Sequence, residues 1–263
     1  MKCIVCVKQV PDTSGVVAVK EDGTMDRAAM ATITNHDDLA AVEAALRIKD
    51  ATGCKVVVVS MGPPPAEGML RELLAMGCDE AVLVSAREFG GSDTYATSQI
   101  LAAAIKKVGV DEDDIVFCGR QAIDGDTAQV GPEISQHMGR ALLTYALEAQ
   151  VEGNTVKIRR ESDEGYDWYA AEMPAVITVN KTSYDLRYPS LKGKMASRKA
   201  VIPTLTAAEV VVPEDKRGLK GSPTKVKKTF TPVRTKNGMR LEGLPGAEAG
   251  RKLADVLAEA KLV

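Results

Sequence analysis

Residues 118–134 read CGRQAIDGDTAQVGPEI, and this stretch shows how the first half of the chain is built. The apolar run that ends at Cys118 predicts a strand, and residues 127–139 predict a helix. The loop between them contains Gly119 and Gly125, and Asp126 or Thr127 is expected to cap the helix. A strand, a loop of small residues and a helix start can present backbone N–H groups to a phosphate. The loop contains neither the dinucleotide fingerprint G-x-G-x-x-G nor the G-K-[ST] ending of a phosphate-binding loop. It therefore fits an anion-binding site and an ordinary capped turn equally well.

The same alternation of strand and helix runs through the first 140 residues. Strands are predicted over residues 2–7, 55–60, 80–84 and 115–118, and helices over residues 38–53, 66–76, 93–108 and 127–139. Such alternation predicts right-handed crossovers and a doubly wound, mostly parallel α/β sheet. Ligands of such sheets bind beyond the carboxyl ends of the strands, where the strand order reverses. The loops to consider are residues 8–12, 35–38, 61–65 and 119–130.

Other segments depart from this pattern. Asp22-Gly23 predicts a hairpin turn within residues 16–27. A hairpin over residues 147–159 and a strand over residues 168–179, interrupted by Pro174, predict an antiparallel extension of the sheet. Residues 183–198 are basic, lack periodicity and predict an exposed loop. We therefore expect an α/β nucleotide-binding domain over residues 1–201.

The remainder, residues 202–263, predicts an extended arm. Pro, Gly and Lys punctuate it up to Gly250, which is too long a stretch for an ordinary internal loop. A short amphipathic helix follows over residues 251–262. Such a helix needs an apolar surface to pack on, so we expect the arm to be ordered against a partner protein.

Composition excludes several functions. The 34 basic residues are balanced by 36 acidic ones, and aromatic residues make up 4% of the chain, which argues against nucleic-acid binding. No apolar run reaches the roughly 18 residues that cross a bilayer, and the first apolar run is too short for a signal peptide. The sequence therefore predicts a cytoplasmic protein without membrane insertion.

The cysteine spacing and the absence of known catalytic motifs bear on whether the side chains form a metal site or a catalytic site. Cys3 and Cys6 have C-x-x-C spacing, but residues three apart on a strand point to opposite faces. The five cysteines are therefore expected to be buried small side chains rather than metal ligands. Neither a nucleophile beside a base nor a metal-ligand pattern can be named in the sequence. A nucleotide-type site without catalytic side chains is typical of proteins whose cofactor carries the chemistry.

Several long motifs, in order, resemble the electron-transfer flavoprotein beta (small) subunits. They are VKQVPDT (7–13), ITNHDDLAAVEAALRIKD (33–50), VVSMGPPPAEGMLRELLAMGCDEAVLVS (58–85), GGSDTYATS (90–98), GRQAIDGDTAQVGPEI (119–134), LRYPSLKGKMASRKA (186–200) and GSPTKVKKTFTP (221–232). The resemblance implies a heterodimer with an alpha subunit that carries an electron-transferring FAD, and an arm that packs on that subunit. It also implies a nucleotide site that holds AMP in the simple members and a second FAD in those that bifurcate electrons.

Carried over residue by residue, the resemblance gives a cofactor-binding site. Its members are Cys6, Asn35, His36, Asp37, Asp38, Met61, Gly119, Arg120, Gln121, Ala122, Ile123, Asp124, Gly125, Asp126, Thr127, Ala128, Gln129 and Val130. The chain has Asn35-His36 where the family usually has Asn-Pro. Asp124 is expected to bind loop backbone or a ribose, and Arg120 to lie near the flavin or the NADH phosphates or simply in solvent.

The small residues Gly125 and Ala128 favour FAD over AMP, because they let a ribityl chain and a second phosphate approach closely. The resemblance then implies that this FAD accepts hydride from NADH. One electron would pass through the alpha-subunit FAD to an acyl-CoA or hydroxy-acid dehydrogenase, and the other to ferredoxin or flavodoxin. One alternative is a subunit holding structural AMP. The other is a stand-alone adenine-nucleotide-binding regulatory module, which the long arm disfavours.

The resemblance also implies a docking segment for the dehydrogenase. Its residues are Tyr188, Leu191, Lys192, Lys194 and Met195, with Leu191 as an apolar anchor. An exposed apolar anchor flanked by lysines suits a transient interface, in which charges steer the encounter and the anchor supplies affinity.

Overall fold

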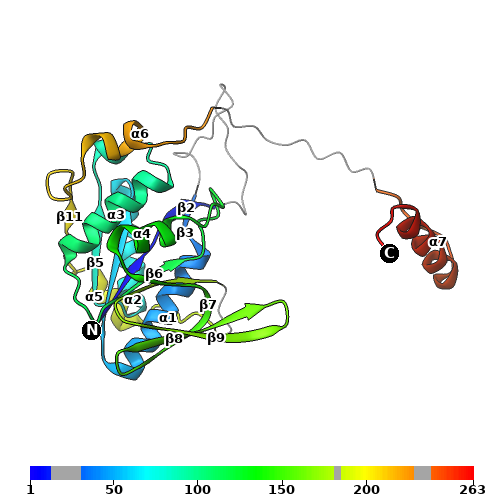
Figure 1. Cartoon of the computed structure of the whole chain (residues 1–263), viewed down its shortest axis with the longest axis horizontal. Coiled ribbons are helices and arrows are strands. Elements are labelled where there is room, and N and C mark those ends of the chain that lie inside the picture. Colours follow the sequence, from blue (N-terminus) through cyan, green and yellow to red (C-terminus); the bar gives the residue numbers. More distant parts are fainter. Residues whose placement is uncertain (13–30, 181–184, 228–237) are drawn as a thin grey trace. The chain divides into compact units, whose positions relative to one another are not determined.

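The computed structural model describes residues 1–12, 31–180, 185–227 and 238–263 (Figure 1). The chain comprises two units, Met1–Lys228 and Thr229–Val263. The first unit reaches past residue 201, where the arm was expected to begin. The hairpin expected over residues 16–27 lies outside the described residues.

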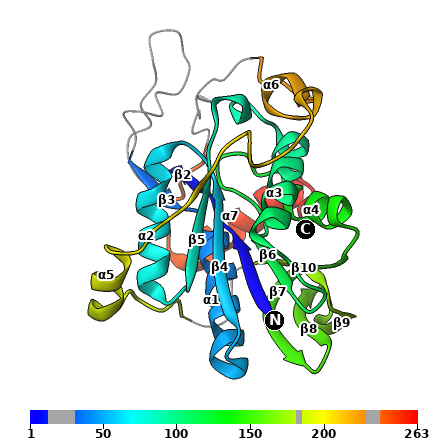
Figure 2. The same cartoon turned by 90° about the vertical axis from the view of Figure 1, so that its left-hand side faces the viewer.

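The first unit is built on a sheet of nine strands in the order β11-β5-β4-β1-β6-β10-β7-β8-β9 (Figure 2). Neighbouring strands from β11 to β7 are parallel, and β7, β8 and β9 are antiparallel. The strands, including the separate pair β2–β3, are β1 (Lys2–Cys6), β2 (Gln9–Pro11), β3 (Thr32–Thr34), β4 (Lys55–Met61), β5 (Glu80–Val84), β6 (Ile115–Gly119), β7 (Ala141–Glu152), β8 (Thr155–Ser162), β9 (Gly165–Glu172), β10 (Ala175–Val179) and β11 (Thr204–Leu205). The predicted doubly wound α/β sheet with an antiparallel extension is confirmed.

Helices cover both faces of the sheet. The helices of the first unit are α1 (His36–Thr52), α2 (Glu67–Met76), α3 (Thr94–Val108), α4 (Val130–Met138), α5 (Leu191–Ser197) and α6 (Gly218–Gly221), with 3-10 turns at Pro64–Ala66, Arg87–Phe89 and Glu214–Lys216. Apolar residues of α1 and α2 pack with one face of the sheet, and those of α3 and α4 with the other. Strands between two such layers bury both faces, which explains why β4 is a continuous apolar run.

The predicted burial of the cysteines is confirmed. Cys3 lies in the core on the α1–α2 side and Cys6 in the core on the α3–α4 side, as the strand period requires. All five cysteines are buried and free.

The expected strand over residues 168–179 is wrong in one respect: it is two strands. β9 ends at Glu172, the Met173-Pro174 peptide bond is cis, and β10 begins at Ala175. β10 does not extend the antiparallel part; it lies between β6 and β7 and is parallel to both. All five of its residues, AVITV, are buried, as a strand covered on both faces requires.

The expected exposed loop over residues 183–198 contains a helix. Ser190 caps α5 by accepting a hydrogen bond from the Gly193 N–H at 2.9 Å. α5 packs beside α2, and a Cβ on Gly193 would come within 2.2 Å of the Ala75 carbonyl oxygen. Glycine at this position therefore permits the close contact between the two helices. The helix has two turns, too few for apolar periodicity to reveal it.

The chain after Ala200 returns to the sheet before it reaches the second unit. β11 pairs in parallel with β5 at the sheet edge. Further on, the Asp93 carboxylate accepts hydrogen bonds from the Thr224 N–H at 2.9 Å and its hydroxyl at 2.8 Å. Asp93 also caps α3 through the Ala96 N–H. One carboxylate thus joins the start of α3 to a segment 131 residues further along the chain.

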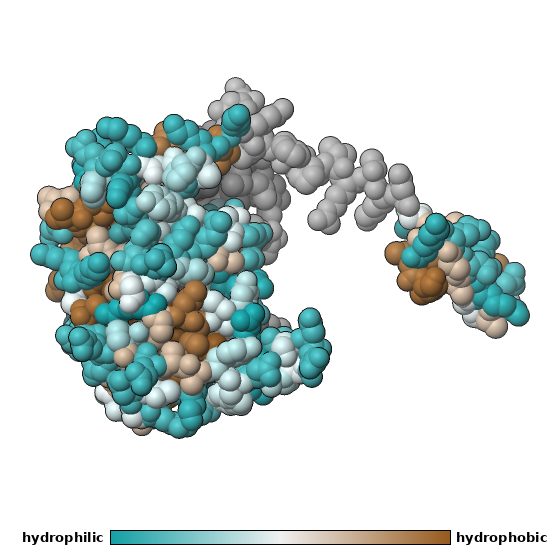
Figure 3. Space-filling view, in the orientation of Figure 1, coloured by the Kyte–Doolittle hydropathy of each residue, from teal (hydrophilic) through white to brown (hydrophobic). Residues whose placement is uncertain are grey.

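The second unit contains one described helix, α7 (Gly246–Glu259). It begins earlier and ends earlier than the helix expected over residues 251–262. None of its residues is buried, and Leu253 is half exposed. The helix carries both hydrophilic and hydrophobic surface, visible in Figure 3. Within the described ranges, no helix is long and apolar enough to cross a membrane.

Candidate functional site

The site lies at the carboxyl ends of β1, β4 and β6. From β1 the chain crosses to β4 and then β5 on one side, and it returns to β6 on the other side of β1. The strand order therefore reverses between β1 and β6, which is the position where open α/β sheets bind ligands (Figure 2). The structure places the predicted residues Cys6, Met61 and Gly119 at the ends of these three strands.

The first turn of α1 is joined to the loops after β1 and β6 by a buried carboxylate. Asp38 accepts hydrogen bonds from the Lys8 N–H at 2.8 Å and from the Gly119 N–H at 3.1 Å. Asp38 is 7% exposed. A Cβ on Gly119 would lie 2.3 Å from the Asp38 carboxylate and 2.6 Å from its backbone nitrogen, so β6 and α1 can approach this closely only with glycine there.

Asn35 joins α1 to the loop that follows β6. Its side-chain amide donates to the Gln121 carbonyl at 2.8 Å, and its carbonyl oxygen accepts from the Ile123 N–H at 3.2 Å. Asn35 is fully buried, while its neighbour His36 is exposed. The Asn35 side chain therefore binds the backbone of this loop, whereas His36 lies at the surface.

The burial of Asp38 makes stability depend on pH. Burial raises the pKa of Asp38 from 3.8 to about 7, against the opposing effect of its N–H donors. Between about pH 4 and 7 the folded state therefore holds a proton that the unfolded chain releases. The free energy of unfolding should fall as pH rises through this window, by at most about 1.4 kcal/mol per pH unit from this group.

Asp38→Asn should reduce the dependence of the free energy of unfolding on pH. It should also lower stability at every pH, because one hydrogen-bond acceptor is lost. Urea unfolding of both proteins at several pH values across the window measures the difference. If the free energy of unfolding changed with pH equally in both proteins, Asp38 would not titrate in this range.

Two charged side chains of the loop after β6, Arg120 and Asp124, form ion pairs. Asp124 binds the Lys8 ammonium at 2.7 Å, and Arg120 lies 3.3 Å from Asp37. Asp124 was expected to bind loop backbone or a ribose, so the Lys8 partner is an addition that the separate loop motifs did not reveal. Each pair fixes a loop end to a neighbouring element, and each lowers the net charge that the loop presents to a ligand.

The outer part of the loop faces solvent. Gly125, Asp126, Thr127 and Gln129 are exposed, and Gln121 and Asp126 are joined by a 2.9 Å hydrogen bond. Asp126 and Ala128 have φ of 50° and 54°, the left-handed region that costs a residue with a side chain about 1–2 kcal/mol. Strained backbone of this kind is concentrated at binding sites.

The expected helix start at Thr127 is wrong. α4 begins at Val130 because the positive φ at Ala128 cannot continue a helix. Neither Asp126 nor Thr127 caps it: Gln129 is the N-cap residue, and in the part of the chain that the structure describes its side chain makes no capping hydrogen bond. The first turn of α4 thus opens onto the loop without a side-chain cap.

Residues of α3 and α4 support the site from one face of the sheet. The Thr94 hydroxyl lies 3.0 Å from the Gln129 side chain and 3.3 Å from Glu133, and His137 lies 3.2 Å from the Ser98 hydroxyl. Burial lowers the pKa of His137. The partner of His137 is on another helix, a neighbour that the apolar periodicity of α4 cannot show.

The predicted docking residues all lie on or beside α5. Tyr188, Leu191 and Met195 are 92%, 78% and 62% exposed, and Lys192 and Lys194 are also exposed. Arg187 holds the preceding segment in place by binding Glu43, which is 2% exposed, at 2.9 and 3.0 Å. The segment therefore presents apolar side chains to solvent from an anchored backbone.

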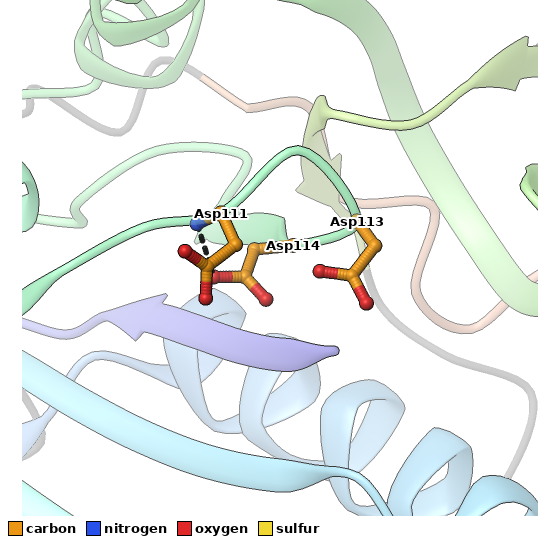
Figure 4. A group of neighbouring side chains, drawn as sticks. All are labelled: Asp111, Asp113 and Asp114. Atoms are coloured by element: carbon orange, nitrogen blue, oxygen red, sulfur yellow. Dashed lines mark hydrogen bonds between the residues drawn. The ribbon is translucent and has the colours of Figure 1, made fainter.

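Three acidic residues lie close together at the amino end of β6, at the other end of the strand from the candidate site. Carboxylate oxygens of Asp111, Asp113 and Asp114 lie within 4.8 Å of one another (Figure 4). The Lys2 ammonium lies 3.6 Å from Asp111 and 3.5 Å from Asp114, and the Met1 ammonium lies 2.8 Å from Asp113. Asp114 also accepts from two backbone N–H groups. Through these contacts the three carboxylates connect the start of β1 to the segment before β6, which is a structural role.

The fold and the site define a class: a doubly wound α/β protein with a braced loop at its switch point and a short exposed helix, α5, beside α2. Residues 16–210 match the family described as electron transfer flavoprotein domain. The chain is 51% identical over 248 residues to the "Acryloyl-CoA reductase electron transfer subunit gamma" of Anaerotignum propionicum, covering 92% of this chain and 93% of the relative.

Other relatives match over similar lengths. The "Electron transfer flavoprotein subunit beta" of Megasphaera elsdenii is 47% identical over 247 residues, covering 92% of each chain. The "Caffeyl-CoA reductase-Etf complex subunit CarD" of Acetobacterium woodii is 42% identical over 264 residues, covering 100% of each. The chain therefore belongs to the electron-transfer flavoprotein family, with strong similarity to its beta subunits.

Proposed function

We propose that this chain is the small subunit of a heterodimeric, electron-bifurcating flavoprotein and that it holds FAD at the switch point between β1 and β6. The observation that carries the proposal is the exposed, strained loop at residues 125–128, which leads into a helix without a side-chain cap. Relatives named for acryloyl-CoA and caffeyl-CoA reductases support a role in electron delivery to such enzymes.

The residues present fit a nucleotide of this size. Backbone N–H groups of the loop and of the first turn of α4 would bind the phosphates, and Thr127 would add a hydroxyl donor. Among the described residues, a Cβ built on Gly125 has no neighbour within 4 Å, so the space above this glycine is open to a ligand. Asn35 and Asp38 would hold the loop in shape rather than contact the phosphates, since their side chains already bind protein backbone.

A bound flavin would supply hydride acceptance from NADH and release of electrons one at a time. The chain itself would bind and orient the cofactor and contribute no acid, base or nucleophile. We further propose that the electrons leave by two routes: through the alpha-subunit FAD to an acyl-CoA or hydroxy-acid dehydrogenase, and to ferredoxin or flavodoxin.

Cofactor counting tests the proposal. The chain is co-expressed with the alpha subunit encoded by the same organism, and FAD and AMP are measured per purified heterodimer after acid release. Two FAD per heterodimer are expected. One FAD with one AMP would contradict bifurcation and leave a structural nucleotide, and adenine-nucleotide binding by an isolated monomer without flavin would favour a regulatory module.

Docking through α5 gives a separate prediction. Leu191→Ala should slow electron delivery to the dehydrogenase about tenfold, because apolar anchors at the centre of an interface contribute most of its affinity. NADH oxidation by an artificial acceptor should not change, since Leu191 is remote in the fold from the loop at residues 119–130.

Val211→Ala is the matched control, because Val211 is 82% exposed but does not belong to the docking segment. Steady-state rates with both acceptors are measured for the three proteins. Equal losses in both assays for Leu191→Ala would exclude a pure docking role.

The arm is proposed to bind the alpha subunit. In this proposal the residues that follow Lys228, including α7, pack on that partner, which would cover the apolar residues of α7 that its own unit leaves exposed. A chain that ends before Thr229 should then co-purify less alpha subunit than the full chain, as measured by size-exclusion chromatography.

A further inference from the structure

Two thiols, Cys3 and Cys54, lie in contact near the amino ends of β1 and β4. The proposed electron transfer does not use them. The Cys3 and Cys54 sulfur atoms are 3.7 Å apart. Cys3 is on β1, and Cys54 lies in the turn between α1 and β4. A disulfide has its sulfurs about 2.05 Å apart, so small side-chain rotations would bring them to bonding distance.

Access and reactivity differ between these two thiols. Cys3 is fully buried, whereas Cys54 is flanked by the exposed residues Gly53 and Lys55 and is itself 7% exposed. Hydrogen bonds from Cys3 and Thr52 lower the pKa of Cys54 to about 6, against the effects of burial and of Asp79. A thiolate is the nucleophilic form of cysteine, so Cys54 is the thiol that reacts first.

A second thiol pair provides an internal comparison. Cys6 and Cys118 are aligned neighbours on β1 and β6, and the Cys6 side chain and burial raise the pKa of Cys118 well above its usual range. Cys78 is a third environment, since burial raises its pKa to about 12. The pKa of Cys118 and of Cys78 is thus raised, whereas that of Cys54 is lowered.

We propose that Cys3 and Cys54 form a redox modification site, at which hydrogen peroxide converts the two thiols into an intramolecular disulfide. The Cys54 thiolate attacks one peroxide oxygen, which forms a sulfenic acid and releases water after protonation. The Cys3 sulfur then displaces the hydroxyl group as a second water, which forms the S–S bond. Two thiols lose two electrons and two protons, and one peroxide is reduced to two waters.

Peptide mapping tests this site. The full-length chain is treated with hydrogen peroxide, quenched with N-ethylmaleimide in denaturant and digested with trypsin without reductant. A cross-linked pair of peptides, residues 3–8 and 50–55, is expected, and its fragments should place the bond at Cys3 rather than Cys6. Cys78 and Cys118 should carry the maleimide, and dithiothreitol should reverse the cross-link.

The variants separate the site from general oxidation. Cys54→Ser should abolish the cross-link, and Cys78→Ser should leave its yield unchanged. Maleimide on both Cys3 and Cys54 after peroxide treatment would overturn the proposal, and so would a cross-link between Cys6 and Cys118 at equal yield. The peptide map of the unmodified sequence decides the question even if a variant fails to fold.

Discussion

Replacing Gly125 with valine is expected to remove the FAD of this subunit while the α/β unit stays folded. In the structure a Cβ at this position meets no described atom within 4 Å, and Gly125 is exposed. The free energy of unfolding should therefore change by less than about 0.5 kcal/mol, as for other surface substitutions. A branched side chain would instead occupy the space above the loop, where the proposal places the ligand.

The measurement is the flavin content of the purified heterodimer, which should fall from two FAD to one. Gly68→Val is the control, because Gly68 is also exposed and also has no neighbour within 4 Å, but it lies on α2. It should keep both flavins without loss of helix stability, because valine is a better helix former than glycine. An undiminished flavin content in Gly125→Val would place the cofactor elsewhere or show that the site holds a smaller nucleotide.

Gly119→Ala is expected to have the opposite effect, a large loss of stability. The added Cβ would lie 2.3 Å from the Asp38 carboxylate, 2.6 Å from the Asp38 nitrogen and 2.7 Å from the Asp37 carbonyl carbon. Two of these neighbours are backbone atoms of α1, so the strand and the helix must separate. Overpacking of a core costs about 1–3 kcal/mol and occasionally more, and the Gly119–Asp38 hydrogen bond would weaken as well.

We therefore expect a loss of about 3 kcal/mol in the free energy of unfolding, measured by urea titration of the full chain. Gly68→Ala should be neutral or slightly stabilising, because alanine is the better helix former. A Gly119→Ala variant as stable as the original chain would show that β6 and α1 can separate at little cost. Gly119 at the end of β6 would thus act in the fold, and Gly125 in the loop that follows would act in binding.

The parallel core was predictable because its signals are local. Runs such as KVVVVSM in β4 report burial on both faces, and the apolar spacing of α1 and α3 reports helices. The opposite placement of Cys3 and Cys6 followed from the strand period alone. Family motifs then pointed to the loop after β6 as the site.

The errors arose where distant residues decide local structure. β10 was joined to β9 because a sequence does not show which strands become neighbours; its position between β6 and β7 depends on pairing with both. α5 is stabilised by its contact with α2, to which Gly193 contributes, and α4 begins late because Ala128 adopts a positive φ. Each of these outcomes depends on non-local contacts that override local propensity.

The amino-acid sequence by itself determined the doubly wound α/β class, the buried cysteines, the exposure of Tyr188, Leu191 and Met195, and the family. Those properties depend on the period of apolar residues and on linear motifs, both of which are local. Only the tertiary structure showed that Asp38 and Asn35 brace the loop, that Gly119 rather than Gly125 is required for packing, and that Cys3 contacts Cys54. These depend on side chains 51 to 88 positions apart in the chain, which only folding brings within hydrogen-bond or van der Waals distance.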